Sequence, residues 1–78
     1  MDDRNSKKIL ANNIRHYMEL HNKTRNEMCT ALNVKYTTFT DWVNAKTYPR
    51  IERIEQIASY FGIETSVLLE DPLRLASD

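Results

Sequence analysis

Residues 24–44, TRNEMCTALNVKYTTFTDWVN, contain two short amphipathic segments that only two residues separate. Within each segment apolar residues recur every three or four positions, so each is expected to form a helix with one buried stripe. The apolar positions are Met28, Cys29, Ala31 and Leu32 in the first segment and Phe39, Trp42 and Val43 in the second. Asn33, between them, is one of the few residue types besides glycine that adopt the left-handed conformation in which many helices end. The stretch therefore predicts a helix-turn-helix unit whose second helix has a polar outer face.

The composition of the whole chain is typical of one small soluble domain. It has 78 residues, of which 41% are apolar and 28% charged, with one glycine and two prolines. No apolar run approaches the roughly 20 residues that a membrane span needs. The single cysteine cannot form an internal disulfide, which favours a reducing, cytoplasmic setting. We therefore expect an all-α cytoplasmic domain that makes no membrane contact and holds no cofactor.

Helical patterns flank the central unit on both sides. A first helix, capped by Ser6, is expected to end at Asn22, and Thr24 with Glu27 matches the capping box that opens the next helix. The central unit's second helix is expected from about 35 to 43, a fourth helix ends at Gly62, and a short fifth spans about 65–70. The fourth helix has an apolar face made of Ile51, Ile54, Ile57, Ala58 and Phe61. Five helices thus form one compact domain over residues 1–71, and residues 72–78 are interpreted as a tail or the start of a linker.

The order and spacing of these motifs resemble the lambdoid repressor or Cro-type helix-turn-helix domains of the XRE-like family. The matching stretches are 13–15, 24–28, 31–34, 37–44, 46–49 and 57–62, so the resemblance covers roughly residues 9–69. It implies a five-helix lambda-repressor-like fold that binds double-stranded DNA.

The chain departs from the family pattern at several positions. Arg25 stands where the family usually has a glutamine that contacts a phosphate, and Asn33 and Ala45 stand where glycine is common. Alanine is unfavourable at positive φ, so we expect Asn44 to make the bend after the second helix of the unit. Many members also bury an arginine–glutamate pair at positions where this chain has Met18 and Val43. Replacing one partner alone would cost about 3–5 kcal/mol, whereas replacing both is often neutral, so the double change supports the alignment.

The resemblance implies that the second helix of the unit enters the major groove. Its outward side chains, Tyr36, Thr37, Thr40 and Asp41, are the candidates for reading base edges. The simpler alternative is a solvated polar face. Asp41 would repel phosphate unless it accepts a hydrogen bond from a cytosine amine, and its alternative role is an ion pair with a nearby lysine.

Candidate phosphate contacts surround that helix. They are Arg25, Lys35, Thr38, Asn44, Lys46 and Arg50. Helix N-termini attract phosphate, and basic side chains add counterion release. Arg25 and Asn44 match contact positions of the family, while the default role of any single lysine is ordinary surface solubility.

Charge is unevenly divided, although its net value is zero. Residues 1–50 carry nine basic and five acidic side chains, a balance of +4, and residues 51–78 carry two basic and six acidic ones, a balance of −4. The first fifty residues can therefore face DNA while the acidic end turns away. Because this basic surface is modest, we expect weak binding by one copy and a need for a dimer.

No pattern favours an enzyme or a metal site. Cys29 lies in a helical stripe, as a packed thiol does, and His16 and His21 are five residues apart on different sides of a helix. We expect a sequence-specific repressor of phage, prophage or bacterial type, acting as a homodimer on a palindromic operator. The last helix, with Val67, Leu68 and Leu69, is the candidate dimer surface. Domains similar to this one often precede a C-terminal domain, and residues 72–78 would then be the start of the linker to it.

The alternative is a protein-interaction module, such as an antitoxin or a regulatory subunit that uses the same fold to bind a protein partner. The zero net charge, the acidic C-terminal third and Asp41 on the presumed reading face favour this alternative.

Overall fold

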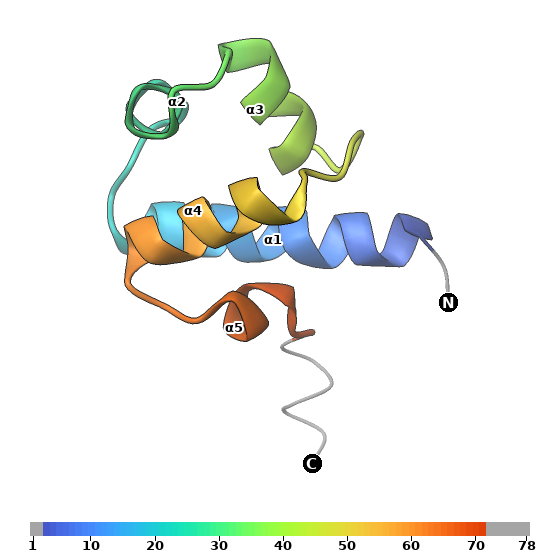
Figure 1. Ribbon diagram of the computed structural model, residues 1–78. Helices are drawn as coiled ribbons and strands as arrows, with labels where there is room; N and C mark the ends of the chain where they lie inside the picture. Colours follow the sequence, from blue (N-terminus) through green and yellow to red (C-terminus); the bar gives the residue numbers. More distant parts are fainter. Residues whose placement is uncertain (1–2, 72–78) are drawn as a thin grey trace.

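The fold is built on one long helix, against which two of the four shorter helices pack. The computed structural model describes residues 3–71, with side chains from residue 6 onward. Its helices are α1 (Asp3–Leu20), α2 (Arg25–Leu32), α3 (Tyr36–Val43), α4 (Ile51–Phe61) and α5 (Thr65–Leu69), and the described residues contain no strand. Helices α3 and α5 pack against α1, while α2 contacts α3 and α4 (Figure 1). The predicted all-α, five-helix architecture is confirmed.

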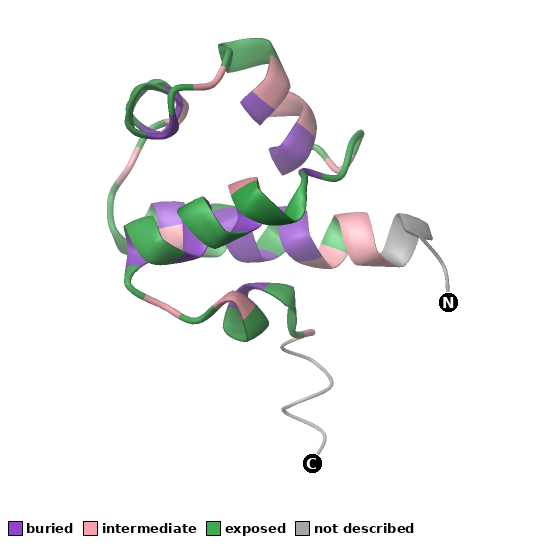
Figure 2. Ribbon diagram, in the orientation of Figure 1, coloured by how far each residue is buried: buried purple, intermediate pink, exposed green. Residues whose placement is uncertain are grey.

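A single hydrophobic core joins all five helices (Figure 2). Its fully buried side chains include Ile14 of α1, Met28 of α2, Phe39 of α3, Ile57 of α4 and Leu68 of α5. The apolar pair that replaces the family's ion pair also lies in this core, since Met18 is 9% exposed and Val43 is 1% exposed. No charge is therefore left buried at that place.

Some apolar residues that were expected to face the core lie at the surface. Ala31 is exposed because it lies to one side of the stripe that Met28, Cys29 and Leu32 already form on the eight-residue helix α2. Ile51, the first residue of α4, is 53% exposed because it precedes the part of the helix that reaches the core at Ile54. The start of α1 also differs from expectation. It begins at Asp3, not at a Ser6 cap.

Four helices end in the same backbone motif. Each has one residue in the left-handed conformation, namely Asn22 (φ 56°), Asn33 (φ 57°), Ala45 (φ 62°) and Gly62 (φ 73°). The following residue's N–H then donates to a carbonyl five positions back, as Val34 does to Cys29 at 3.1 Å. This Schellman arrangement satisfies carbonyl groups that the helix itself leaves free. It gives all four turns the same sharp geometry.

The turn after α3 corrects one expectation. Ala45 adopts the positive φ, whereas Asn44, which was expected to make the bend, has φ −100°. The reason is the register of the hydrogen bonds. The Lys46 N–H donates to the Asp41 carbonyl at 2.9 Å, and this bond places Ala45 at the left-handed position regardless of its side chain.

Ala45→Gly is expected to stabilise the domain by about 0.5–1 kcal/mol. A Cβ in the left-handed region costs the folded state roughly 1–2 kcal/mol, and glycine removes this cost. Glycine also gives the unfolded chain more conformational freedom, which lowers the net stabilisation by about 0.4–1 kcal/mol. The melting temperature should rise by roughly 3–6 °C for a domain of this size. Asn44→Gly is the matched control and should lower it, because φ at Asn44 is negative. A lower melting temperature for Ala45→Gly would show that the residue is not strained.

The start of α2 is closed by the predicted capping box. The Thr24 hydroxyl accepts from the Glu27 N–H at 3.2 Å, and the Glu27 carboxylate accepts from the Thr24 N–H at 2.8 Å. This backbone hydrogen bond from Thr24 is the main reason that the pKa of Glu27 lies below its ordinary value of 4.5. The box fixes where α2 begins, and therefore where Arg25 stands.

Candidate nucleic-acid interface

Helices α2 and α3 meet at a corner made of Asn33, Val34 and Lys35. The left-handed Asn33 reverses the chain direction at the end of α2, and α3 then starts far from α1 and α5 (Figure 1). The first turn of α3 is exposed, whereas its later turns carry Phe39, Trp42 and Val43 into the core (Figure 2). The corner thus presents the first turn of α3 at an edge of the molecule.

The four candidates for base reading are placed unequally along α3. Tyr36, 47% exposed, and Thr37, also exposed, lie together on the free first turn. Thr40 and Asp41 are partly buried, and the Thr40 hydroxyl oxygen is buried without a hydrogen-bond partner in the described chain. In this side-chain conformation the Thr40 hydroxyl offers nothing to a ligand outside. The exposed part of this helix face is therefore centred on Tyr36 and Thr37.

The alternative role of Asp41, an ion pair with a lysine, does not occur within the described residues. The backbone carbonyl of Asp41 instead accepts from the N–H groups of Lys46, at 2.9 Å, and Thr47, at 3.4 Å. Asp41 therefore helps to shape the loop after α3.

The phosphate candidates lie near the starts of three helices. Arg25 opens α2, Lys35 directly precedes α3 and Arg50 directly precedes α4. Neither Lys35 nor Arg50 caps its helix with a side chain, so N–H groups at both helix starts stay free for an anion. Asn44 and Lys46 are exposed in the loop between α3 and α4, and Thr38 is partly buried.

These basic side chains have no competing partner inside the described part of the chain. Arg25, Lys35, Lys46 and Arg50 form neither an ion pair nor a side-chain hydrogen bond with any described residue. A basic group that no carboxylate neutralises keeps its full charge for an external anion. The chain therefore offers uncompensated positive charges at the starts of α2, α3 and α4 and in the loop after α3.

A hollow of about 400 Å³ adjoins this set and was not foreseen. It is lined by Trp42, Thr47, Tyr48, Pro49, Arg50 and Arg53. Tyr48 in this hollow is 44% exposed. Its position between Lys46 and Arg50 in a loop is the sequence feature that could have indicated it. Arg53 is half-buried, and its guanidinium donates to the Leu32 carbonyl at the end of α2.

The candidate dimer residues separate into two groups. Leu68 is fully buried in the core of its own chain, whereas Val67 and Leu69 are 36% and 37% exposed. The five-residue helix α5 turns one of three consecutive apolar residues inward, and only the other two are free to meet a second copy.

Cys29 is buried, and both histidines pack against aromatic rings. Burial raises the pKa of the Cys29 thiol, which stays protonated at neutral pH. The His21 ring packs against Phe61 at 5.2 Å between centroids, and the His16 ring meets Tyr17 at 5.1 Å. No group of three or more potential ligands among the described residues is placed to hold a metal ion. None of the described helices has the length and apolar character needed to cross a bilayer.

Comparisons with known proteins agree with this geometry. A family model described as the Cro/C1-type HTH DNA-binding domain matches residues 13–72. The solution structure of the SOS-response transcriptional repressor LexA from Eubacterium rectale is similar, with a TM-score of 0.83 and 31% identity, covering 87% of this chain and 72% of that chain. The crystal structure of a hypothetical transcription factor, NHTF from Neisseria, shares the fold at a TM-score of 0.86 and 18% identity, covering 99% and 88% of the two chains. No curated protein sequence gives a significant match.

Proposed function

Because the chain belongs to the family of Cro/C1-type helix-turn-helix DNA-binding domains, we propose that it is a transcriptional repressor of phage, prophage or bacterial type. In this proposal it binds one specific double-stranded operator. The similarity to a protein named as a transcriptional repressor supports the repressor role. The single observation that carries the proposal is the exposed first turn of α3 with unpaired basic residues on either side of it.

Phosphate contacts would set the register on the duplex. Arg25 lies at the start of α2 and Lys35 lies in the corner directly before α3, while Lys46 and Arg50 follow α3. Such contacts provide affinity but carry no sequence information directly. Because α2 and α3 are held at a fixed angle, these phosphate contacts would also fix the orientation in which the first turn of α3 enters the major groove.

Base reading falls to Tyr36 and Thr37 in this proposal. The threonine methyl group can meet a thymine methyl, and its hydroxyl can donate or accept a hydrogen bond at a base edge. The phenol of Tyr36 can reach a base edge or a phosphate. Thr40 and Asp41, which are partly buried, would lie at the border of the contact, and the buried Thr40 hydroxyl would take no part in it.

The repressor would act as a dimer on a two-fold operator. One copy offers few basic contacts, and a two-fold pair would place its half-sites about one helical turn, roughly 34 Å, apart. The exposed side chains of Val67 and Leu69 are the apolar groups that α5 offers to a second copy.

The salt dependence of DNA binding tests this function. If the four unpaired basic residues each contact a phosphate, the logarithm of the association constant for DNA should fall with the logarithm of the salt concentration with a slope of about −4 for each bound copy. Lys46→Gln should reduce that slope by about 0.9. Arg15→Gln is the matched control, because Arg15 donates to Asn12 within α1 and is no candidate contact. Binding that barely changes with salt, or a partner protein held through Val67 and Leu69, would favour the protein-interaction alternative.

A further inference from the structure

The C-terminal end of α2 has a hydrogen-bond partner on another helix. The carbonyls of Cys29 and Thr30 are satisfied, since they accept from the N–H groups of Val34 and Asn33. The carbonyl of Leu32, the last residue of α2, lies at the negative end of the helix dipole. The last turn of α2 contains no basic residue that could neutralise this end.

Arg53 of α4 supplies both the donor and the charge. Its Nη1 donates to the Leu32 carbonyl oxygen at 2.8 Å, and the contact is partly buried. The same nitrogen donates to Oε1 of Gln56 at 2.9 Å, one turn further along α4. The second bond holds the guanidinium in place before any ligand arrives. A charged donor in a fixed geometry forms a stronger bond than a neutral one.

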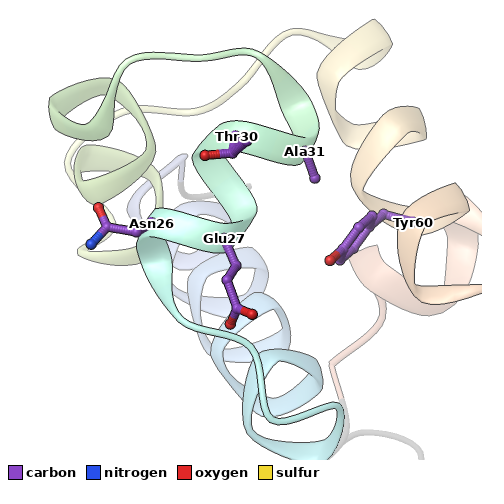
Figure 3. A pocket seen from close by; sticks show the side chains of 5 residues that line it. All are labelled: Asn26, Glu27, Thr30, Ala31 and Tyr60. Carbon is purple, nitrogen blue, oxygen red and sulfur yellow. The ribbon is translucent and has the colours of Figure 1, made fainter.

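This contact is the one hydrogen bond that joins α2 to α4 within residues 6–71. On the outer side of the two helices an open cleft of about 420 Å³ lies between them (Figure 3). Asn26, Glu27, Thr30 and Ala31 line it on the α2 side, and Tyr60 faces them from α4. Arg53 therefore provides the hydrogen-bonded link between the two helices, in addition to the apolar side chains that both place in the core.

We propose that Arg53 is a positioning residue of the DNA interface, which fixes the corner between α2 and α3 by holding the Leu32 carbonyl. The inference rests on the proposed function, because it concerns how the same interface is held. Arg25 opens α2 and Tyr36 opens α3, so the angle at the corner sets the distance between a phosphate contact and a base contact. In this proposal Arg53 acts through the Leu32 carbonyl and does not itself touch a base.

The test compares Arg53→Gln and Arg53→Lys in binding a labelled duplex that the unaltered protein enriches from a random pool. Arg53→Gln should weaken binding about tenfold, as expected when a charged hydrogen bond that orders the site is lost. The slope of log K against log salt should not change, because no phosphate contact is removed. Arg53→Lys should restore part of the affinity, since an ammonium can still donate to one carbonyl. Arg15→Gln, with the same change in charge and a local partner in Asn12, should bind within about twofold of the unaltered protein.

Two outcomes of the binding experiment overturn the proposal. If Arg53→Gln binds as tightly as the unaltered protein while folded, Arg53 does not position the interface. If the salt slope falls by about 0.9, Arg53 is itself a phosphate contact.

Amide hydrogen exchange tests the corner without DNA. In Arg53→Gln the Asn33 and Val34 amides, which close the end of α2, should exchange faster. The Gly62 and Ile63 amides close the same motif at the end of α4 and should not change, so they serve as an internal reference. If no duplex is enriched at all, the proposed function fails, and this measurement still decides whether Arg53 holds the corner. Unchanged exchange at Asn33 and Val34 would overturn the inference.

Discussion

Asn13→Ala is expected to lower the free energy of unfolding by about 2–4 kcal/mol, because two carbonyl groups lose a hydrogen bond and at least one stays buried. Asn13 is 5% exposed and is the buried polar residue of α1. Its Nδ2 donates to the carbonyl oxygens of Leu68 at 2.6 Å and Glu70 at 2.7 Å. These bonds attach the end of α5 to the middle of α1. The loss is large against the 5–15 kcal/mol or so by which a typical domain is stable.

The neighbouring asparagine provides a matched control. Asn12 is exposed, and its side chain only accepts a hydrogen bond from Arg15 within the same helix, so Asn12→Ala should change stability by less than about 0.5 kcal/mol. Asn13→Asp should be at least as harmful as Asn13→Ala, since a carboxylate would face two carbonyl oxygens with no proton to donate. Urea denaturation of the three variants provides the measurement. Equal stabilities of the Asn12→Ala and Asn13→Ala variants would contradict the role of Asn13.

Tyr36→Ala and Thr37→Ala are each expected to weaken binding to the enriched duplex by about 5- to 150-fold, the effect of about 1–3 kcal/mol for a lost base contact. Both side chains lie on the free first turn of α3, where they can reach a groove without rearrangement of the core. Binding to random duplex DNA should barely change, because the phosphate contacts remain. The quantity to measure is therefore the ratio of the two affinities for each variant.

Thr30→Ala is the control for this pair, since Thr30 is an exposed threonine on α2 that lines the cleft facing α4. It should keep both affinities. All three changes alter surface side chains, so the melting temperature of each variant should stay within a few degrees of that of the unaltered protein. A loss of binding at an unchanged melting temperature is then not caused by unfolding. If Tyr36→Ala and Thr37→Ala kept the full ratio, the first turn of α3 would not read the operator.

Much of the fold was predictable because it is encoded locally. The capping box of Thr24 and Glu27, the ends at Asn22, Asn33 and Gly62, and the core stripes of α2 to α4 follow from residues within one or two turns of each other. The family, predicted from six short motifs, is confirmed by the model that matches residues 13–72. The contact roles of single residues remain predictions, because they depend on a ligand that lies outside the chain.

The features that were missed depend on distant parts of the chain. Asn13 reaches carbonyls 55 and 57 residues away, and Arg53 reaches one 21 residues away, so no local pattern could indicate either contact. At Ala45 the local preference gave the wrong answer, because the hydrogen bond from Lys46 to Asp41 decides which residue takes the positive φ. In α5, three consecutive apolar residues in a helix of five leave no periodicity that could single out Leu68.

The most direct test of the central claim is a titration of the protein against fragments of its own genomic neighbourhood, with an excess of random duplex DNA as competitor. The proposed function predicts that one upstream fragment with a two-fold sequence keeps its complex in the competitor, and that raising the salt concentration weakens this complex steeply. Equal binding to every fragment would contradict sequence-specific recognition. The absence of binding at low salt would contradict DNA as the partner and favour a protein in its place.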